Sequence, residues 1–338
     1  MALKRCARTP ALDFKHFEVA NGAQRLHCVS LGEGPLVLLC HGFPGLWYSW
    51  RHQMPALAEA GYRAVALDMR GYGRSSRPRD AAEYRYDHLA ADLIAVMDHL
   101  GARDAVLFGH DFGANFAWHM GVHHAGRIRA IAPLCAPYAM ELAGASDVLP
   151  SELYASIARQ HFFHMHYYQA DGVERANLGR ERAFLMRLFW ALCGEGDLLG
   201  WEDFPAAGTH YFDVLAEPER APPWRWLSAE DFDFYVREYL AAEPELVFIG
   251  GISAYRAMDH NWRQFHASRH ASLDLPVLFV GGAEDPVTRM AGPETFDRMR
   301  ERVRDLRGCE LLPGAGHFIQ QEAPEALNAL LLEFLAGL

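Results

Sequence analysis

Five short apolar segments, each bounded by turn residues, alternate along the chain with segments of helical pattern; they span residues 36–40, 63–67, 105–109, 129–134 and 277–281. Strands that are apolar along their whole length are buried on both faces, which is typical of parallel sheets covered by helices. Between the second and third segments, one helical stripe is formed by Leu89, Leu93, Val96, Met97 and Leu100. The sequence therefore predicts an α/β protein with a parallel sheet wrapped by helices.

The middle of the chain lacks the strand pattern and is rich in aromatic and histidine side chains. Its apolar residues fit several short helices, and a strand-like segment appears again only near residue 277. We therefore expect a helical cap formed by residues 138–265, inserted into a core that is formed by residues 1–137 and 266–338.

The formal net charge of −11 disfavours nucleic acids and anionic membranes as partners. No apolar stretch follows the basic start of the chain, and no run of about 18 apolar residues occurs, so we expect neither a signal peptide nor a transmembrane helix. The six cysteines are scattered, which favours buried free thiols over a disulfide framework. These features together favour a cytoplasmic protein.

The segment 109–113 (GHDFG) follows a predicted strand and opens a helical stretch. The glycines two positions before and after Asp111 permit a tight strand-to-helix turn, which holds the central side chain above the sheet. In esterases the centre of such a turn is a serine, whereas here it is an aspartate. An aspartate before a helix is often only a cap, so this motif needs support from the rest of the sequence.

Asp111 is followed along the chain first by an acid and then by a histidine, which is the order expected when the nucleophile lies on a turn of this kind. His317 lies in a glycine-rich loop after a short strand near the C-terminus, and Asp285 lies at the turn after the strand 277–281. We predict that Asp111 is the nucleophile, Asp285 the acid and His317 the base. Glu284 is the rival for the role of the acid.

Two backbone N–H groups are expected to form the oxyanion hole, one after the nucleophile and one in the loop after the first long strand. In this sequence they belong to Phe112 and Phe43. Pro44 follows Phe43, lacks an N–H group and stiffens the loop.

A carboxylate nucleophile favours displacement at an sp³ carbon, which leaves an alkyl ester on Asp111. Water activated by His317 would then attack the ester carbonyl, with Asp285 orienting the imidazole. The leaving group is either an epoxide oxygen, which needs a proton donor, or a halide, which needs N–H donors.

The chain resembles the epoxide hydrolases of the α/β-hydrolase family over essentially its whole length from about Phe14. The matching segments are 41–44 (HGFP), 47–51 (WYSWR), 71–76 (GYGRSS), 109–113 (GHDFG), 255–256 (YR) and 316–317 (GH). The resemblance implies an α/β-hydrolase fold, a mostly parallel sheet flanked by helices with an inserted helical cap. It also implies an enzyme that hydrolyses small-molecule epoxides to vicinal diols without a cofactor or metal ion.

In that family two cap tyrosines donate hydrogen bonds to the epoxide oxygen, and Tyr255 matches one of them. Aligning the other on Gln169 places His164 at its position, which is a departure from the family pattern. Some epoxide hydrolases pair a histidine with a tyrosine, so we expect His164 to be the second donor. Tyr167 and Tyr168 are its rivals.

We also expect an apolar pocket between cap and core, lined by His41, Pro44, Trp47, Phe162 and Tyr168. Many relatives carry a tryptophan next to the nucleophile where this chain has Phe112. A phenylalanine has no side-chain donor but keeps an aromatic wall, which epoxide hydrolysis tolerates. The aromatic-rich cap is a candidate surface for a homodimer.

A dehalogenase is the nearest alternative, because it shares the fold and the aspartate nucleophile. Haloalkane dehalogenases hold halide with side-chain N–H donors where this chain has Phe112 and Phe43. Fluoroacetate dehalogenases hold the substrate carboxylate with arginines just after the nucleophile, and residues 112–115 include none. These differences favour an epoxide.

Three other classes fit the sequence less well. A non-catalytic receptor predicts a damaged set of catalytic residues, and an ordinary esterase requires a serine at the strand-to-helix turn. A metal enzyme is disfavoured because His119, His123 and His124 share one predicted helix without an acidic ligand nearby.

Overall fold

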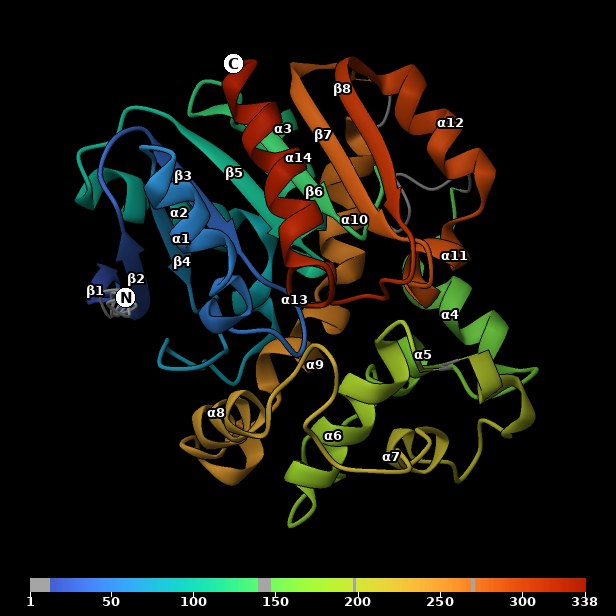
Figure 1. The fold of residues 1–338 in the computed structure, drawn as a ribbon. Helices are drawn as coiled ribbons and strands as arrows, with labels where there is room; N and C mark the ends of the chain where they lie inside the picture. Colours follow the sequence, from blue (N-terminus) through green and yellow to red (C-terminus); the bar gives the residue numbers. More distant parts are fainter. Residues whose placement is uncertain (1–12, 139–146, 197–198, 269–270) are drawn as a thin grey trace, which may run out of the picture.

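The computed structural model describes residues 13–138, 147–196, 199–268 and 271–338. Its centre is an eight-stranded sheet with the order β1-β2-β4-β3-β5-β6-β7-β8 (Figure 1). Only the pairs β1–β2 and β2–β4 are antiparallel. The strands are β1 (Lys15–Asn21), β2 (Gln24–Leu31), β3 (Leu36–Cys40), β4 (Arg63–Leu67), β5 (Ala105–His110), β6 (Ile128–Leu134), β7 (Leu273–Gly282) and β8 (Val303–Leu312). The predicted mostly parallel sheet is confirmed.

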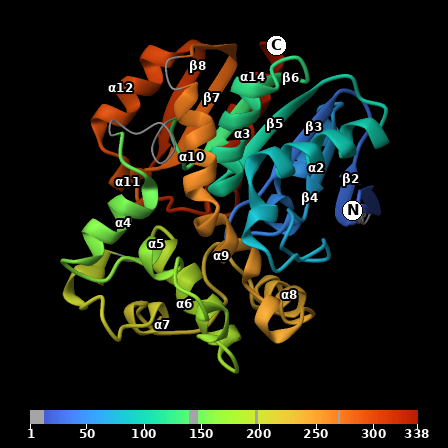
Figure 2. The ribbon, with the colours of Figure 1, turned by 180° about the vertical axis from the view of Figure 1, so that it is seen from behind.

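Helices cover both faces of this sheet. One face carries α1 (Gln53–Glu59) and α14 (Pro324–Ala336), and the other carries α2 (Tyr86–His99), α3 (Phe112–His123) and α10 (Met258–Ala267) (Figures 1 and 2). Three more helices follow β7 or β8: α11 (Pro286–Ala291), α12 (Pro293–Arg302) and α13 (Ile319–Glu322). Short 3₁₀ helices span Trp47–Trp50, Ala81–Tyr84, Val173–Arg175, Leu199–Asp203 and Pro244–Leu246.

The central strands β3 and β5 are buried at every position, as their continuous apolar sequences predict. Because successive side chains of a strand point to opposite faces, each strand serves two layers. Leu39 and Phe108 belong to the cluster on the side of α1 and α14. Leu38 and Leu107 belong to the cluster on the side of α2 and α3. The strand ends are therefore held rigidly from both sides.

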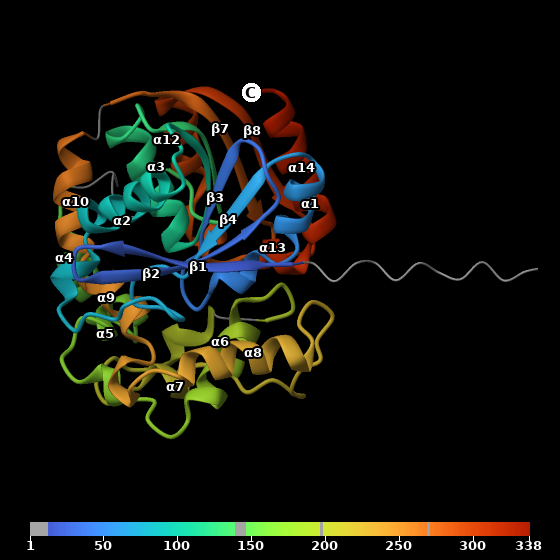
Figure 3. The same ribbon diagram turned by 90° about the vertical axis from the view of Figure 1, so that its left-hand side faces the viewer.

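Between β6 and β7, the described residues form helices, turns and loops without a strand. The elements α5 to α9 lie beyond the end of the sheet at which the parallel strands finish (Figures 1 and 3). The helices that precede α10 in this region are α4 (Pro150–Ala158), α5 (His164–Tyr167), α6 (Glu181–Leu192), α7 (Tyr211–Val214), α8 (Ala229–Leu240) and α9 (Ile249–Arg256). This arrangement places a helical layer over the carboxyl ends of the strands.

Polar contacts join α8 to the core below it. The Tyr48 hydroxyl donates to Asp231 at 2.7 Å, and the Arg51 guanidinium pairs with the same carboxylate at 3.3 Å. Further along the helix, Arg74 pairs with the buried Glu238 at 2.8 Å. The helical layer is thus tied to the core by charged groups as well as by apolar packing.

In the part of the chain that the structure describes, no helix is long and apolar enough to cross a membrane. Most of the described cysteines are buried free thiols, as expected: Cys28, Cys40, Cys135 and Cys193. Cys309 is only partly buried, because it lies on the edge strand β8. Cys6 lies outside the described residues.

Candidate active site

The turn between β5 and α3 holds Asp111 in an unusual backbone conformation, with φ 57° and ψ −120°. Flanking glycines make the turn sterically feasible. A Cβ atom on Gly109 would lie 2.1 Å from the Gly113 carbonyl oxygen, and one on Gly113 would lie 2.2 Å from the Cys40 carbonyl oxygen. A non-glycine residue at positive φ costs about 1–3 kcal/mol and persists only where the surroundings enforce it. In this backbone conformation, the carboxylate of Asp111 lies above the end of the sheet.

Backbone N–H groups bind the Asp111 carboxylate. The Phe43 N–H donates to Oδ1 at 2.8 Å, and the Phe112 N–H also donates to this carboxylate. Gly42 permits this approach, because a Cβ atom there would lie 2.1 Å from Oδ1. The two predicted oxyanion-hole residues therefore contact the carboxylate of Asp111 itself.

The buried side chain of His41 fixes the loop that carries Phe43. Its Nε2 atom accepts a hydrogen bond from the Met69 N–H at 3.0 Å, so its Nδ1 atom carries the proton and donates to the Gly42 carbonyl at 2.8 Å. Burial lowers the pKa of His41 below its ordinary value, which keeps the ring neutral. His41 thus supports the oxyanion loop.

His317 lies between two carboxylates. Its Nε2 atom is 3.5 Å from Oδ2 of Asp111, and its Nδ1 atom is 3.1 Å from Oδ1 of the buried Asp285. Asp285 is fixed by the Val287 N–H and by the Thr288 hydroxyl, each at 2.8 Å. Glu284, the rival acid, is partly exposed and pairs with Arg289 instead.

The charges of this group stabilise one another. Burial tends to raise the pKa of Asp111, but contact with His317 and the charge of that histidine lower it below the ordinary value. Burial tends to lower the pKa of His317, but the charge of Asp285 and its contacts with both aspartates raise it well above the ordinary value. In the free protein the pair is therefore an aspartate beside an imidazolium.

A cavity opens above Asp111 between the helical layer and the core. Its lining combines the predicted catalytic group with apolar and aromatic side chains: Phe43, Asp111, Phe112, His164, Met165, Leu188, Leu192, Trp201, Tyr211, Tyr255, Val287, Met290 and His317. About 18 % of the Asp111 side chain stays open to this space. Such a site suits a small apolar ligand that carries one polar group.

Tyr255 and His164 enter this cavity from α9 and from the start of α5. Their rings are 5.5 Å apart, and the edge contact between Tyr255 and Phe112 spans 4.9 Å between ring centres. Burial lowers the pKa of His164 to about 3. The ring is therefore neutral near pH 7 and carries a single N–H proton.

The rival residues for the second donor lie elsewhere. Tyr168 is buried outside the cavity lining and stacks on Tyr255 at 5.0 Å. The Tyr167 hydroxyl faces His210 at 3.5 Å. His164 is therefore the better placed of the three residues.

Four other residues that were predicted to line the pocket are absent from the lining of the cavity above Asp111: His41, Pro44, Trp47 and Phe162. Trp47 packs against Phe14 and Phe234. Phe162 is buried against Tyr211, which places it one layer behind the lining. The loop residue Pro44 follows Phe43 through a cis peptide bond.

Several lining residues were not singled out from the sequence. Met165, Leu188, Leu192, Trp201 and Tyr211 come from the helical layer, and Val287 and Met290 come from α11. Leu188 and Leu192 are four residues apart on α6 and therefore share one helix face, but such spacing equally describes a core residue. Their position becomes clear only when the layer is folded over the sheet.

Among the described residues, one group of three side chains has the spacing of a metal site: His110, Cys135 and His317. His317 in this group also faces Asp111 and Asp285, and all three residues of the group are buried. His119 packs against His123 at 4.5 Å between ring centres, and burial lowers the pKa of both rings.

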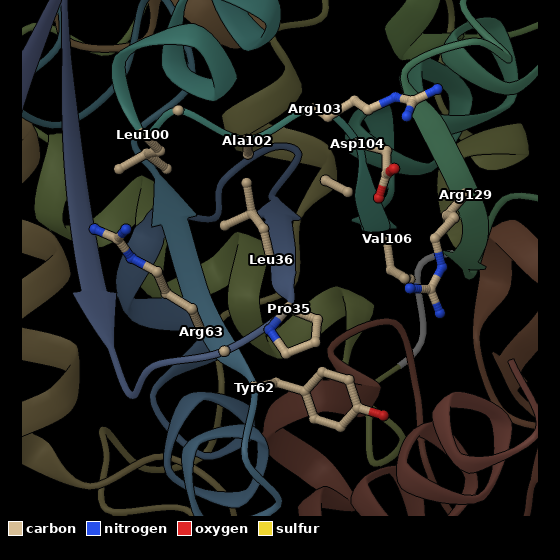
Figure 4. Close-up of a pocket in the computed structure, with 13 residues that line it drawn as sticks. Pro35, Leu36, Tyr62, Arg63, Leu100, Ala102, Arg103, Asp104, Val106 and Arg129 are labelled. Carbon is tan, nitrogen blue, oxygen red and sulfur yellow. The ribbon is translucent and has the colours of Figure 1, made fainter.

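A separate open cleft of about 290 Å³ lies at the opposite end of the sheet. Ala105, at the start of β5, lines this cleft, whereas Asp111 directly follows the end of the same strand. Three arginines surround it, but Figure 4 shows that Arg63, Arg103 and Arg129 point in different directions. They form no common binding centre.

Comparisons with known proteins find relatives over most of the chain. The α/β hydrolase fold family matches residues 35–324. Epoxide hydrolase A of Mycobacterium tuberculosis (strain ATCC 25618 / H37Rv) is 40% identical over 318 residues, covering 93% of this chain and 95% of that protein. Epoxide hydrolase B of the same strain is 35% identical over 348 residues, covering 93% and 96%.

Solved structures give the same result. The crystal structure of Epoxide Hydrolase A from Mycobacterium thermoresistibile has a TM-score of 0.86 and 37% identity, and the match covers 96% of this chain and 99% of that one. An epoxide hydrolase from an endophytic Streptomyces has a TM-score of 0.87 and 35% identity, with 96% of each chain covered.

Proposed function

The chain belongs to the epoxide hydrolases of the α/β-hydrolase fold family, and from this premise we propose that it opens epoxides with water to vicinal diols through an ester on Asp111. The observation that carries this mechanism is the position of the Asp111 carboxylate. Its Oδ1 atom accepts the Phe43 N–H, Oδ2 lies 3.5 Å from His317 Nε2, and the residue lines the cavity. One oxygen is thus held in the oxyanion hole and the other is available to attack.

In the first step, Asp111 Oδ2 attacks one carbon of the epoxide and the bond from that carbon to the ring oxygen breaks. The ring oxygen takes a proton from Tyr255, with His164 donating a second hydrogen bond. Donation from a neutral imidazole agrees with the lowered pKa of His164, because a cation buried there would be destabilised. The product of this step is a hydroxyalkyl ester of Asp111.

In the second step, His317 takes a proton from water, and the resulting hydroxide attacks the ester carbonyl. Negative charge develops on the carbonyl oxygen, where the Phe43 and Phe112 N–H groups stabilise it. The bond between the Asp111 carbonyl carbon and the alkyl oxygen then breaks, and the leaving alkoxide takes the proton of the newly formed Asp111 carboxyl group. The diol therefore leaves with the original Oδ2 atom, and Asp111 is again a carboxylate. The new oxygen of Asp111 comes from water.

Ester formation also changes the pKa of His317 before this step. The Asp111 carboxylate contributes to the raised pKa of His317, and the ester is neutral. The pKa of His317 therefore falls once Asp111 is alkylated, so the imidazolium releases its proton, which restores the Tyr255 hydroxyl through solvent. The neutral imidazole is then available as the base.

We propose that residues 138–265 act as the cap that closes this site and supplies the donors. Its apolar side chains, such as Leu188, Trp201 and Tyr211, favour epoxides with apolar substituents. The Phe43 and Phe112 side chains lack the N–H donors that hold a halide, whereas Tyr255 offers a proton donor, so the site favours an epoxide over a halide.

The activity is tested by incubating the protein with styrene oxide and measuring the diol, in parallel with halide release from haloalkanes and haloacetates. We expect diol from the wild type and none above background from Asp111→Asn. Halide release without diol would show that the same nucleophile serves a dehalogenase.

A further inference from the structure

A buried carboxylate, Glu322 on α13, lies beside the loop of His317 and has no part in the steps described so far. It accepts three backbone hydrogen bonds: from the Gly316 N–H at 3.0 Å, from the Phe318 N–H at 2.9 Å and from the Gly194 N–H at 2.8 Å. None of the ion pairs in the described ranges includes it. Burial raises the pKa of Glu322, and the three N–H groups oppose this rise, so the carboxyl group is held by peptide N–H donors.

Two of these donors flank the catalytic histidine directly. Because Gly316 and Phe318 are the neighbours of His317, the Glu322 carboxylate holds the backbone on both sides of the imidazole. Hydrogen bonds to an ionised acceptor are about twice as strong as neutral ones. Glu322 thus binds the backbone on both sides of His317, while Asp285 contacts the ring itself.

The third donor belongs to the segment that follows α6. The His317 N–H donates to the Leu192 carbonyl at 2.9 Å, and Leu192 also lines the cavity. The two backbones touch closely, since a Cβ atom on Gly316 would lie 2.2 Å from the Gly194 nitrogen. Glu322 therefore joins the histidine loop to the cavity wall above it.

We propose that Glu322 is a positioning residue that holds His317 in line with Asp285 and the Asp111 ester, and that it acts in hydrolysis of the ester more than in its formation. This proposal rests on the proposed function. His317 acts as a base only in the second step, whereas the first step depends on Asp111 and the cap donors. A small displacement of the imidazole therefore slows the release of diol selectively.

The test compares Glu322→Gln with Glu322→Asp and with Glu325→Gln, an exposed site on α14 that matches the change in charge. The glutamine amide cannot accept hydrogen bonds at its nitrogen, so at least one of the three N–H groups loses its partner. We expect ester decay to slow by about 10- to 100-fold, because a misplacement of about 1 Å can cost 10²-fold. Ester formation should change less than about threefold.

Two measurements follow these variants. Rapid quenching and mass spectrometry give the fraction of Asp111 held as ester, which should rise in Glu322→Gln and stay at the wild-type level in Glu325→Gln. In the absence of substrate, the low-field proton NMR signal of the imidazole N–H that faces Asp285 should shift or broaden in Glu322→Gln. Glu322→Asp retains the charge but is one methylene shorter, so intermediate effects are expected.

A purely structural role for Glu322 predicts a lower melting temperature with an unchanged ratio of ester decay to ester formation. That result, together with an unchanged imidazole signal, would overturn the proposal. If the wild-type protein forms neither diol nor ester, that result contradicts the proposed function instead. The NMR measurement would still decide whether Glu322 positions His317.

Discussion

The Nε2 atom of His317 lies 3.5 Å from Oδ2 of Asp111, while Oδ1 of the same carboxylate accepts the Phe43 N–H. This separation is longer than a strong hydrogen bond, so the two groups form an ion pair in which Oδ2 keeps its nucleophilic lone pairs. The two oxygens of Asp111 therefore have different partners: Oδ1 is bound by a backbone N–H group, and Oδ2 is available to attack the epoxide.

Replacing His317 with glutamine should trap the ester. Asp111 can still attack the epoxide, but water lacks its base, so steady-state diol formation should fall by about 10²- to 10⁴-fold. Intact-protein mass spectrometry should then show one substrate mass added to the protein, on the peptide that contains Asp111. Loss of activity without any adduct would mean that His317 is needed before the ester forms.

Replacing Tyr255 with phenylalanine removes the donor expected to protonate the ring oxygen. The rate of ester formation should fall by about 10²-fold or more. The matched control is Tyr168→Phe, because Tyr168 stacks on Tyr255 but does not line the cavity. Its single-turnover rate should stay within about threefold of wild type. If Tyr168→Phe is the more damaging change, Tyr168 and not His164 is the partner of Tyr255.

The two steps should depend differently on pH. The pKa of Asp111 is lowered, so ester formation is lost only as the pH falls through that lowered value. The pKa of His317 falls when the ester forms, and hydrolysis requires the neutral ring. The rate of ester decay should therefore rise with pH through the pKa of His317 in the ester, whereas kcat/KM should stay flat over the same range. An equal acid limb in both profiles would contradict this assignment.

A small change in the oxyanion loop should abolish activity without unfolding the protein. In Gly42→Ala the added methyl group would lie 2.1 Å from Asp111 Oδ1 and 2.6 Å from the Phe112 nitrogen. Loss of one oxyanion donor costs about 10²- to 10³-fold in kcat, so at least that decrease is expected. Gly126→Ala is the control, because its added Cβ atom meets no other atom within 4 Å. Equal losses in both variants would show a general effect of added side chains.

Much of the core was predictable, because its strands are apolar along their length and end in recognisable turns. The antiparallel strands β1 and β2 were not predicted, since their sequences mix exposed and buried positions and β1 is mostly exposed. The meeting of Asp111, Asp285 and His317 followed from chain order and strand ends alone. The geometry agrees with that expectation, and the chemical roles of the three residues remain predictions.

The cavity wall was less predictable. Trp47 and Phe162 were expected to line it because they are aromatic, yet each packs against other aromatic rings instead. Trp201 and Tyr211 line it without any motif to mark them. Short helices in the layer above the sheet follow tertiary packing, which periodicity in one sequence does not encode.

The central claim, that Asp111 is the nucleophile, is tested most directly by a single turnover of styrene oxide in water enriched in oxygen-18. With the enzyme in excess, the account predicts that the diol receives its new oxygen from Asp111, while the label appears in the carboxyl group of the Asp111 peptide. Label that enters the diol directly, with Asp111 unlabelled, would contradict the covalent mechanism.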